Sequence, residues 1–278
     1  MSSILTNNSA MTALSTMRNI NKGLNETQTR ISTGLKIRSG KENAAYFSIS
    51  NTMNGDSGMY KAINEGLTLT KNSLATARLG AEKVVDLSKE FAERVAFAQG
   101  DTVDKVEVKN ELTELASRVQ TVIDQATFNG DDLVTSTATV TVVTGVTRAS
   151  GNFSTTTISF NKVDLTAIQG VLSDTAAGIS AGSVNSDMQV FLSDVEGALS
   201  DAIGNATALG IAEKSVETQK DFLENLTDEI DAGTGAMVDA NMEEEAARLQ
   251  ALQVQQQLAT QSLSIANQAP QNILSLFR

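Results

Sequence analysis

The chain has 278 residues, enough for one or two domains with their own cores, and a formal net charge of -12 at pH 7. This acidity disfavours nucleic acid and anionic membranes as partners, because both attract a basic surface. Cysteine and histidine are absent, which excludes disulfides, thiol nucleophiles, thiolate metal sites and the commonest acid–base and zinc chemistry. We therefore expect no enzyme activity, no metal site and no cofactor.

Residues 1–33 are predicted to form a terminal helix that takes part in assembly. The stretch 1–17 carries no ionisable side chain. A row of mostly apolar residues then keeps the four-three spacing of a coiled-coil seam: Ala10, Leu14, Met17, Asn21, Leu24, Gln28, Ile31 and Leu35. We select as interface residues Ile4, Leu14, Met17, Leu24 and Ile31. This end alone favours an ordinary amphipathic helix on a local core, but the second uncharged end described below shifts the balance towards assembly.

A spoke or hinge is expected next, over residues 34–56, because Gly34 and Gly40 interrupt the helical pattern. Rod helices follow over 57–130. Their four-three seams are long and regular, and the Asn-Gly pair at 129–130 favours a turn at the end of the second helix. The two rod helices should fold back on each other as a hairpin.

The composition then changes to Thr, Ser, Val and Gly. The stretches TATVTVVTGVT and NFSTTTISF alternate with period two and are rich in β-branched residues, which predicts strands. We expect a small β-rich surface insertion over 131–186. Its hydroxyl-rich face would be open to sugar attachment.

A third rod helix is predicted over 187–230, with an apolar face that complements the earlier pair. The sequence DAGTGAM at 231–237 contains Gly233 and Gly235, and we expect it to form a second hinge that returns the chain to the terminal domain.

The C-terminal assembly helix, residues 238–278, has no charged side chain between Arg248 and Arg278. It carries two rows of mostly apolar residues on roughly opposite sides. One row is Ala247, Ala251, Val254, Leu258, Gln261 and Ile265, and the other is Met242, Ala246, Leu249, Leu252, Gln256, Ala259, Leu263 and Ala266. A helix with two apolar sides should lie between neighbours on both sides: the N-terminal helix, and other copies of the chain. The candidate interface residues are Leu249, Leu252, Val254, Leu258, Leu263, Ile265, Ile273, Leu276 and Phe277.

Three consecutive acids, Glu243 to Glu245, could suggest a metal or acid–base site. A helix start is the stronger interpretation, because Asn241 as N-cap with Glu244 three positions later forms a capping box, and carboxylates suit the positive end of the helix dipole.

Residues 1–17 lack the basic start and continuous apolar run of a cleavable signal peptide. No window of about 20 residues is apolar enough to span a bilayer. If the protein leaves the cell, we expect another route to carry it.

Two stretches resemble one known family. Residues 265–278, IANQAPQNILSLFR, closely resemble the carboxyl terminus of bacterial flagellins. Residues 31–50 resemble the flagellin motif that reads RLSSGLRI and, a few residues later, DDAAGLAI. The matching residues are Arg30, Ile31, Ser32, Gly34, Leu35, Ile37, Ala44, Ala45 and Ile49. Glu42-Asn43 and Tyr46-Phe47 differ from the commonest sequence of the motif.

The resemblance implies a mainly α-helical, elongated antiparallel rod with paired N- and C-terminal coiled-coil helices and a small β-rich insertion. It also implies a homopolymeric subunit of the extracellular flagellar filament, the propeller for swimming. Export would be through the flagellar type III apparatus, and the partners would be an export chaperone, a cap and hook-junction proteins.

Two other functions share parts of this pattern. A hook–filament junction protein has the same terminal helices, but the matches at 31–50 and 265–278 favour flagellin. A chemoreceptor-like signalling hairpin would also show long Ala/Gln heptads, yet it needs membrane spans or a sensory module. An enzyme or binding module would require a site hidden in the β insertion.

Overall fold

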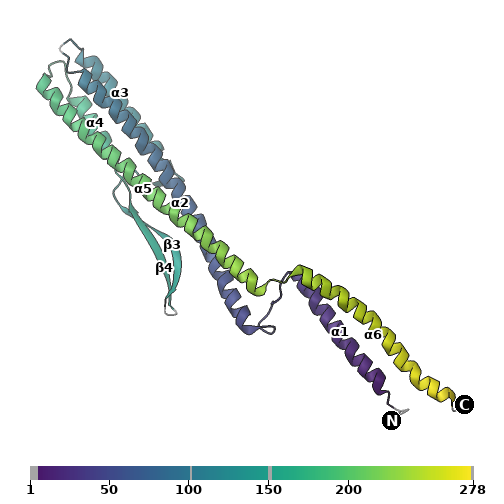
Figure 1. The fold of residues 1–278 in the computed structure, drawn as a ribbon. Coiled ribbons are helices and arrows are strands. Elements are labelled where there is room, and N and C mark those ends of the chain that lie inside the picture. Colours follow the sequence, from purple (N-terminus) through teal and green to yellow (C-terminus); the bar gives the residue numbers. More distant parts are fainter. Residues whose placement is uncertain (1–5, 101, 150–151, 277–278) are drawn as a thin grey trace. The chain divides into compact units, whose positions relative to one another are not determined.

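The structure is a computed structural model that describes residues 6–100, 102–149 and 152–276. The chain is mainly α-helical, as predicted (Figure 1). It divides into two compact units, which we call unit 1 (residues 1–55 and 229–278) and unit 2 (residues 56–228). Two long helices, α2 (Ala44–Phe97) and α5 (Asn185–Val238), contribute to both units.

Unit 1 is built around an antiparallel pair of helices, α1 (Asn8–Thr33) and α6 (Met242–Leu276), which lie side by side in Figure 1. The Asn7 side chain caps the start of α1 by accepting a 3.0 Å hydrogen bond from the Ala10 amide. Gly34 ends the helix with φ +72°, a conformation that favours glycine, and its amide donates to the Arg30 carbonyl. The predicted pairing of the two terminal helices is therefore confirmed within the described residues.

The links between the terminal pair and the long helices differ from the predicted hinges. The first link is shorter than the expected spoke 34–56, because α2 already begins at Ala44. In the second, the predicted break at Gly233 and Gly235 is wrong: α5 continues through both to Val238, and the chain leaves the helix at Asp239–Asn241.

Close packing explains why α5 persists through these glycines. A Cβ built on Gly233 would lie 3.5 Å from the Met53 terminal methyl, so this bare side of the helix is in contact with α2. The two links also pair with each other, since Lys36 donates its amide to the Val238 carbonyl at 2.7 Å and Ala240 donates to the Gly34 carbonyl at 2.8 Å.

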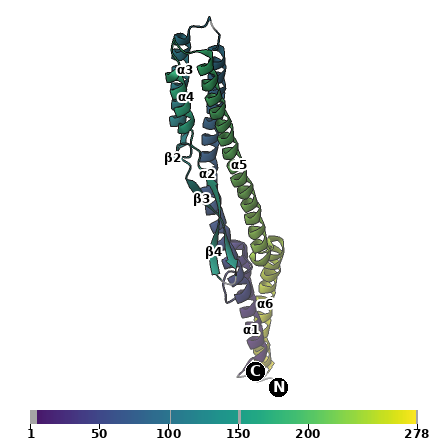
Figure 2. The ribbon, with the colours of Figure 1, turned by 90° about the vertical axis from the view of Figure 1, so that its left-hand side faces the viewer.

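Unit 2 packs its parts of α2 and α5 with α3 (Lys105–Gln125) and α4 (Thr166–Gly178). Figure 2 shows α3 and α4 side by side. The four-three seams predicted for the rod helices form its core. Fully buried members include Leu67, Leu74, Phe91, Leu112 and Leu209.

A tight hairpin follows α3. Strands β1 (Thr127–Phe128) and β2 (Asp131–Asp132) pair antiparallel around Asn129 and Gly130, which both have positive φ, +52° and +80°. Two positive φ values are the signature of a type I′ turn, for which Asn-Gly is the preferred sequence. The predicted turn is confirmed.

The region expected to be β-rich is only partly so. A second hairpin, β3 (Thr139–Ala149) with β4 (Asn152–Asn161), matches the predicted strands. The rest of the interval 131–186 is different, because α4 occupies 166–178 and buries Ile168, Leu172 and Ala176 in the core. The Asp164 side chain accepts from the Thr166 and Ala167 amides and so caps the start of this helix.

The β3–β4 hairpin is held against the helices of unit 2 by two polar contacts. The Tyr60 hydroxyl of α2 donates to the Val146 carbonyl at 3.0 Å, and the Gln219 side chain of α5 donates to the Thr144 carbonyl at 3.1 Å. Thr144 lies at a β-bulge between Val143 and Gly145, where the carbonyl turns out of the ladder.

Candidate assembly surface

The inner seam of unit 1 joins one side of α1 to one side of α6. On α6 it follows one of the two predicted rows from Leu249 onwards, because Leu249, Leu252 and Leu263 are half-buried. On α1 the seam keeps Met17, Leu24 and Ile31. It alternates them with Ala13, Ile20 and Thr27, each one position before a member of the predicted row. The half-buried or buried residues of α1 are Ala10, Ala13, Met17, Ile20, Asn21, Gly23, Leu24, Thr27, Thr29, Arg30 and Ile31.

The prediction that Leu14 belongs to this inner seam is therefore wrong. Its side chain is 40% exposed, and Gln28 of the same predicted row is exposed too. From Met17 onwards the sequence offers two rows, one with Ile20 and Thr27 and the other with Asn21 and Gln28. The seam takes Ile20, Thr27 and, from the second row, Asn21, while Gln28 stays exposed. Leaving the Gln28 amide in water avoids the cost of burying an unpaired polar group.

Polar contacts occur at three levels along the pair. At the base, the Arg30 guanidinium lies 3.1 Å from a Glu245 carboxylate oxygen, and Glu245 is buried. In the middle, the Gln256 amide donates to the Asn21 side-chain oxygen at 2.7 Å. Towards the far end, the Asn7 side chain donates to the Ala266 carbonyl at 2.8 Å. These contacts are directional, so they favour one register of the two helices.

Both helices of the pair also carry large apolar side chains that lie outside the inner seam and stay exposed. On α6, Val254, Leu258 and Ile265 are 54%, 60% and 64% exposed. On α1, Met11 and Leu14 are 64% and 40% exposed. We call these five residues the outer stripe. Large apolar residues gathered in this way mark an interaction surface more often than scattered ones do.

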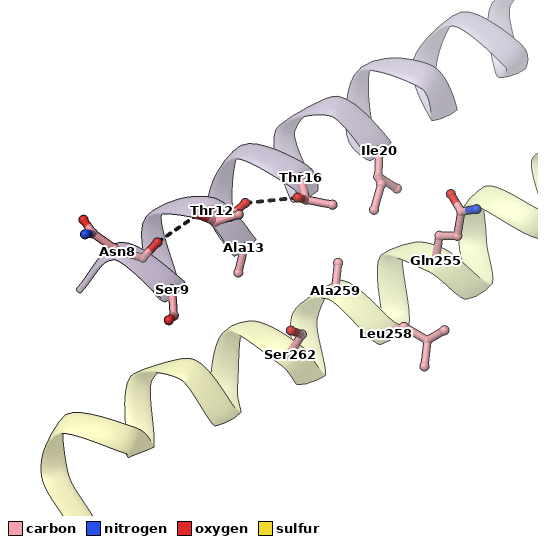
Figure 3. A pocket seen from close by; sticks show the side chains of 10 residues that line it. All are labelled: Asn8, Ser9, Thr12, Ala13, Thr16, Ile20, Gln255, Leu258, Ala259 and Ser262. Carbon is pink, nitrogen blue, oxygen red and sulfur yellow. Dashed lines mark hydrogen bonds between the residues drawn. The ribbon is translucent and has the colours of Figure 1, made fainter. Parts of the chain in front are cut away.

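A groove of about 750 Å³ runs between the two helices, and Leu258 is the one member of the outer stripe that lines it. Figure 3 shows Ala13 and Ile20 of α1 and Ala259 of α6 pointing toward one another, with Leu258 at the rim. The Thr12 and Thr16 hydroxyls that line it donate to carbonyls of their own helix at 2.9 and 3.0 Å. Because these hydroxyls are already bonded, the part of the groove around Ala13, Ile20 and Ala259 suits apolar side chains of another molecule.

The predicted interface residues thus fall into two groups. Met17, Leu24, Ile31, Leu249, Leu252 and Leu263 lie in the inner seam, whereas Leu14, Val254, Leu258 and Ile265 lie on the outer stripe. Ile4 and Phe277 lie outside the described residues, as do the side chains of Ile273 and Leu276. The prediction missed Ile20 and Met11. The three-residue spacing of Ile20 from Met17, and of Met11 from Leu14, was the available signal.

Asn241 is the N-cap of α6, as predicted, but the Glu244 carboxylate lies near Arg248 rather than completing the predicted capping box. The Asn241 side chain accepts hydrogen bonds from the Glu243 and Glu244 amides, at 3.1 and 3.4 Å. Among the described residues, no cluster of three or more acidic side chains is placed to bind a metal ion.

Charge is divided unevenly between the units. Unit 1 contains eight basic and eight acidic residues, whereas unit 2 contains 13 basic and 25 acidic ones. The whole net charge of the chain therefore lies in unit 2, and the unit with the outer stripe is neutral. Copies can bring their unit 1 surfaces together without net electrostatic repulsion.

No helix in the part of the chain that the structure describes is both long and apolar enough to cross a membrane.

Comparison with known proteins places the chain in a family. Residues 4–139 match the bacterial flagellin N-terminal helical region, and residues 192–277 match the bacterial flagellin C-terminal helical region. Over the full length of both chains, it is 37% identical to a flagellin of Brucella melitensis biotype 1. The chain belongs to the bacterial flagellins. It is also 32% identical to flagellin C of Rhizobium meliloti strain 1021, again over all of both chains.

A solved structure, the crystal structure of Bacillus cereus flagellin, shares 12% identity, with a TM-score of 0.45 over 57% of this chain and 88% of the other. The family assignment rests on the sequence matches alone.

Membership of the family defines the general function. Flagellins are structural proteins that assemble into the filament of the bacterial flagellum, and this chain is such a filament subunit for flagellar motility. The predicted resemblance and function are confirmed. The two family regions leave out residues 140–191, which hold α4 and most of the β3–β4 hairpin of this flagellin.

Proposed function

We propose that this flagellin contacts neighbouring copies in the filament through the outer stripe and the adjoining groove of unit 1. One observation supports this most directly: α1 and α6 cover each other's inner seam, yet Val254, Leu258 and Ile265 stay more than half exposed. A neutral unit with an apolar outer side gains by association, because each fully buried Leu or Ile contributes roughly 1.5–3 kcal/mol.

Family membership supports the remaining features of this proposal. The subunit is exported unfolded through the flagellar type III apparatus and joins the extracellular filament beneath a cap. Its further partners are an export chaperone and the hook-junction proteins, and it has no enzymatic role. Chains without cysteine form no disulfides, which suits passage between redox environments.

The links at Gly34 to Gly40 and at Asp239 to Asn241 act in this proposal as hinges that adjust the α1–α6 pair during assembly. Gly34 supports this role, because its φ of +72° is strained for any other residue. The helical Gly233 and Gly235 are not part of either hinge.

Elongation from wild-type filament seeds tests the stripe. We expect Leu258→Asn/Ile265→Asn subunits to keep the helix content of the wild-type monomer by circular dichroism but to elongate seeds at least tenfold more slowly. Gln253→Asn/Thr260→Asn is the matched control, because these exposed positions lie on α6 away from the stripe and carry the same helix-propensity cost. Equal elongation by the stripe variant and the control would overturn the proposal.

A further inference from the structure

Opposite charges in unit 1 lie on different segments of the chain. Residues 1–55 contain six basic and two acidic side chains, whereas residues 229–278 contain two basic and six acidic ones. Unit 1 is neutral only as a sum. On the two helices themselves, α1 has three basic and one acidic side chain, and α6 has three acidic and one basic. Since α1 and α6 lie side by side, the pair has a basic flank and an acidic flank.

The basic flank contains a groove of about 440 Å³ on α1, lined by Arg18, Asn21, Lys22, Asn25, Glu26, Thr29 and Arg38. Arg18 is exposed and makes no ion pair within the described residues. Lys22 lies 3.9 Å from Glu26, but both side chains are more than half exposed, so this pair adds little. The groove therefore presents two cations that their own chain leaves weakly matched.

The acidic flank begins at the first turn of α6. Glu245 turns inward to Arg30. Glu243 is exposed and makes no ion pair in the part of the chain described, and Glu244 meets Arg248 at 3.6 Å with both side chains about half exposed or more. Asn241 already caps this helix through its side chain. Two outward carboxylates are thus available to a cation from outside the chain.

We infer that the α1 groove at Arg18 and Lys22 binds Glu243 and Glu244 of a second copy of the chain. This rests on the proposed function, in which unit 1 carries the contact between copies. Charge complementarity identifies Glu243 and Glu244 as the groups that the groove binds. They belong to a second copy, since no described ion pair joins them to Arg18 or Lys22 within one chain. The contact joins two different surfaces, so each copy presents its α1 groove to one neighbour and the start of its α6 to another. A polar filament requires such a head-to-tail contact, which also fixes the direction of each copy.

Two charge-reversed variants test this contact. Arg18→Glu/Lys22→Glu makes the groove acidic, and Glu243→Lys/Glu244→Lys makes the helix start basic. Each variant alone places like charges together at every contact between copies. In an equimolar mixture, alternating copies again place opposite charges together. The control Lys83→Glu/Lys89→Glu makes the same net charge change as the groove variant, at exposed positions of α2 in unit 2.

The measurement is the critical concentration for polymerisation at low ionic strength, by sedimentation, with monomer helix content checked by circular dichroism. We expect each reversed variant alone to raise it at least tenfold. We expect the critical concentration of the equimolar mixture, and that of the control, to lie within about twofold of the wild-type value. This difference should shrink as salt is added, because screening weakens exposed pairs.

Two results would overturn the inference. Both reversed variants could polymerise like wild type, in which case the flanks do not meet. Alternatively, the mixture could fail while the quadruple variant, which combines all four substitutions in one chain, recovers; the charges would then act within one chain. The stripe variant Leu258→Asn/Ile265→Asn distinguishes failure of this inference from failure of the proposed function. If it fails to elongate seeds, the outer stripe is a contact between copies whatever the charge variants do.

Discussion

The side-chain amide of Gln256 donates a 2.7 Å hydrogen bond to the side-chain oxygen of Asn21, midway along the seam between α1 and α6. Both residues are partly buried. A polar side-chain pair in a mostly apolar seam lowers stability slightly but selects one register, because any shift leaves both amides without a partner. This selection decides which residues of α1 lie beside Leu258 and Ile265 of α6.

Replacing both amides should loosen this register. In Asn21→Leu/Gln256→Leu, we expect the helix pair to be retained while one-heptad shifts become populated. The chain has no cysteine, so disulfide trapping reports the register cleanly. Gly23→Cys/Leu252→Cys reports the native register, because a Cβ at Gly23 would lie 3.5 Å from a Leu252 methyl. Gly23→Cys/Ala259→Cys reports the shift.

The expected outcome is that the native cysteine pair alone crosslinks in the parent sequence, whereas both pairs crosslink in the leucine background. Exclusive native crosslinking in that background would mean that apolar packing sets the register by itself.

Two glycines of α2 should respond oppositely to alanine. A Cβ on Gly80 would lie 2.4 Å from the Ala126 Cβ, so Gly80→Ala forces overpacking that costs about 1–3 kcal/mol. A Cβ on Gly66 would meet no atom within 4 Å, so Gly66→Ala should stabilise the helix by about 1 kcal/mol. Thermal unfolding should show a lower midpoint for the first variant and a higher one for the second. A shift in the same direction for both would contradict the packing described here.

The Glu217 carboxylate accepts from Lys71 of α2 at 2.7 Å and from Lys214 at 3.0 Å. These lysines lower the pKa of Glu217 from 4.5 to about 2, the hydrogen bond from Lys71 being the larger cause. A folded pKa below the unfolded one stabilises unit 2 at pH values above about 4.5, and this stabilisation disappears as the pH falls towards 2.

Denaturant midpoints of wild type and Glu217→Gln should therefore differ at pH 6 and converge near pH 2. Because both members of the Lys71 pair are about one-third exposed, the difference at pH 6 should also decrease with salt. A gap that stays constant from pH 6 to pH 2 would show that ionisation of Glu217 does not stabilise the fold.

The long seams were the most predictable feature, because residues such as Leu67 and Phe91 repeat at four-three spacing over many turns and leave one face to bury. Helix α4 was missed, since its Thr, Ser, Gly and Ala resemble the composition of the preceding strands and only one short face is apolar. Leu14 was placed on the wrong side because α1 offers two rows, and the partner helix decides between them. Gly233 suggested a break that packing against Met53 removes.

The central claim is that the outer stripe of α1 and α6 is covered by neighbouring copies in the filament. A cryo-electron microscopy map of the native filament, at a resolution that shows side chains, tests it most directly. The account predicts that Leu258 and Ile265, 60% and 64% exposed in the single chain, are buried against other subunits. A filament in which both side chains still face solvent or an open lumen would contradict it.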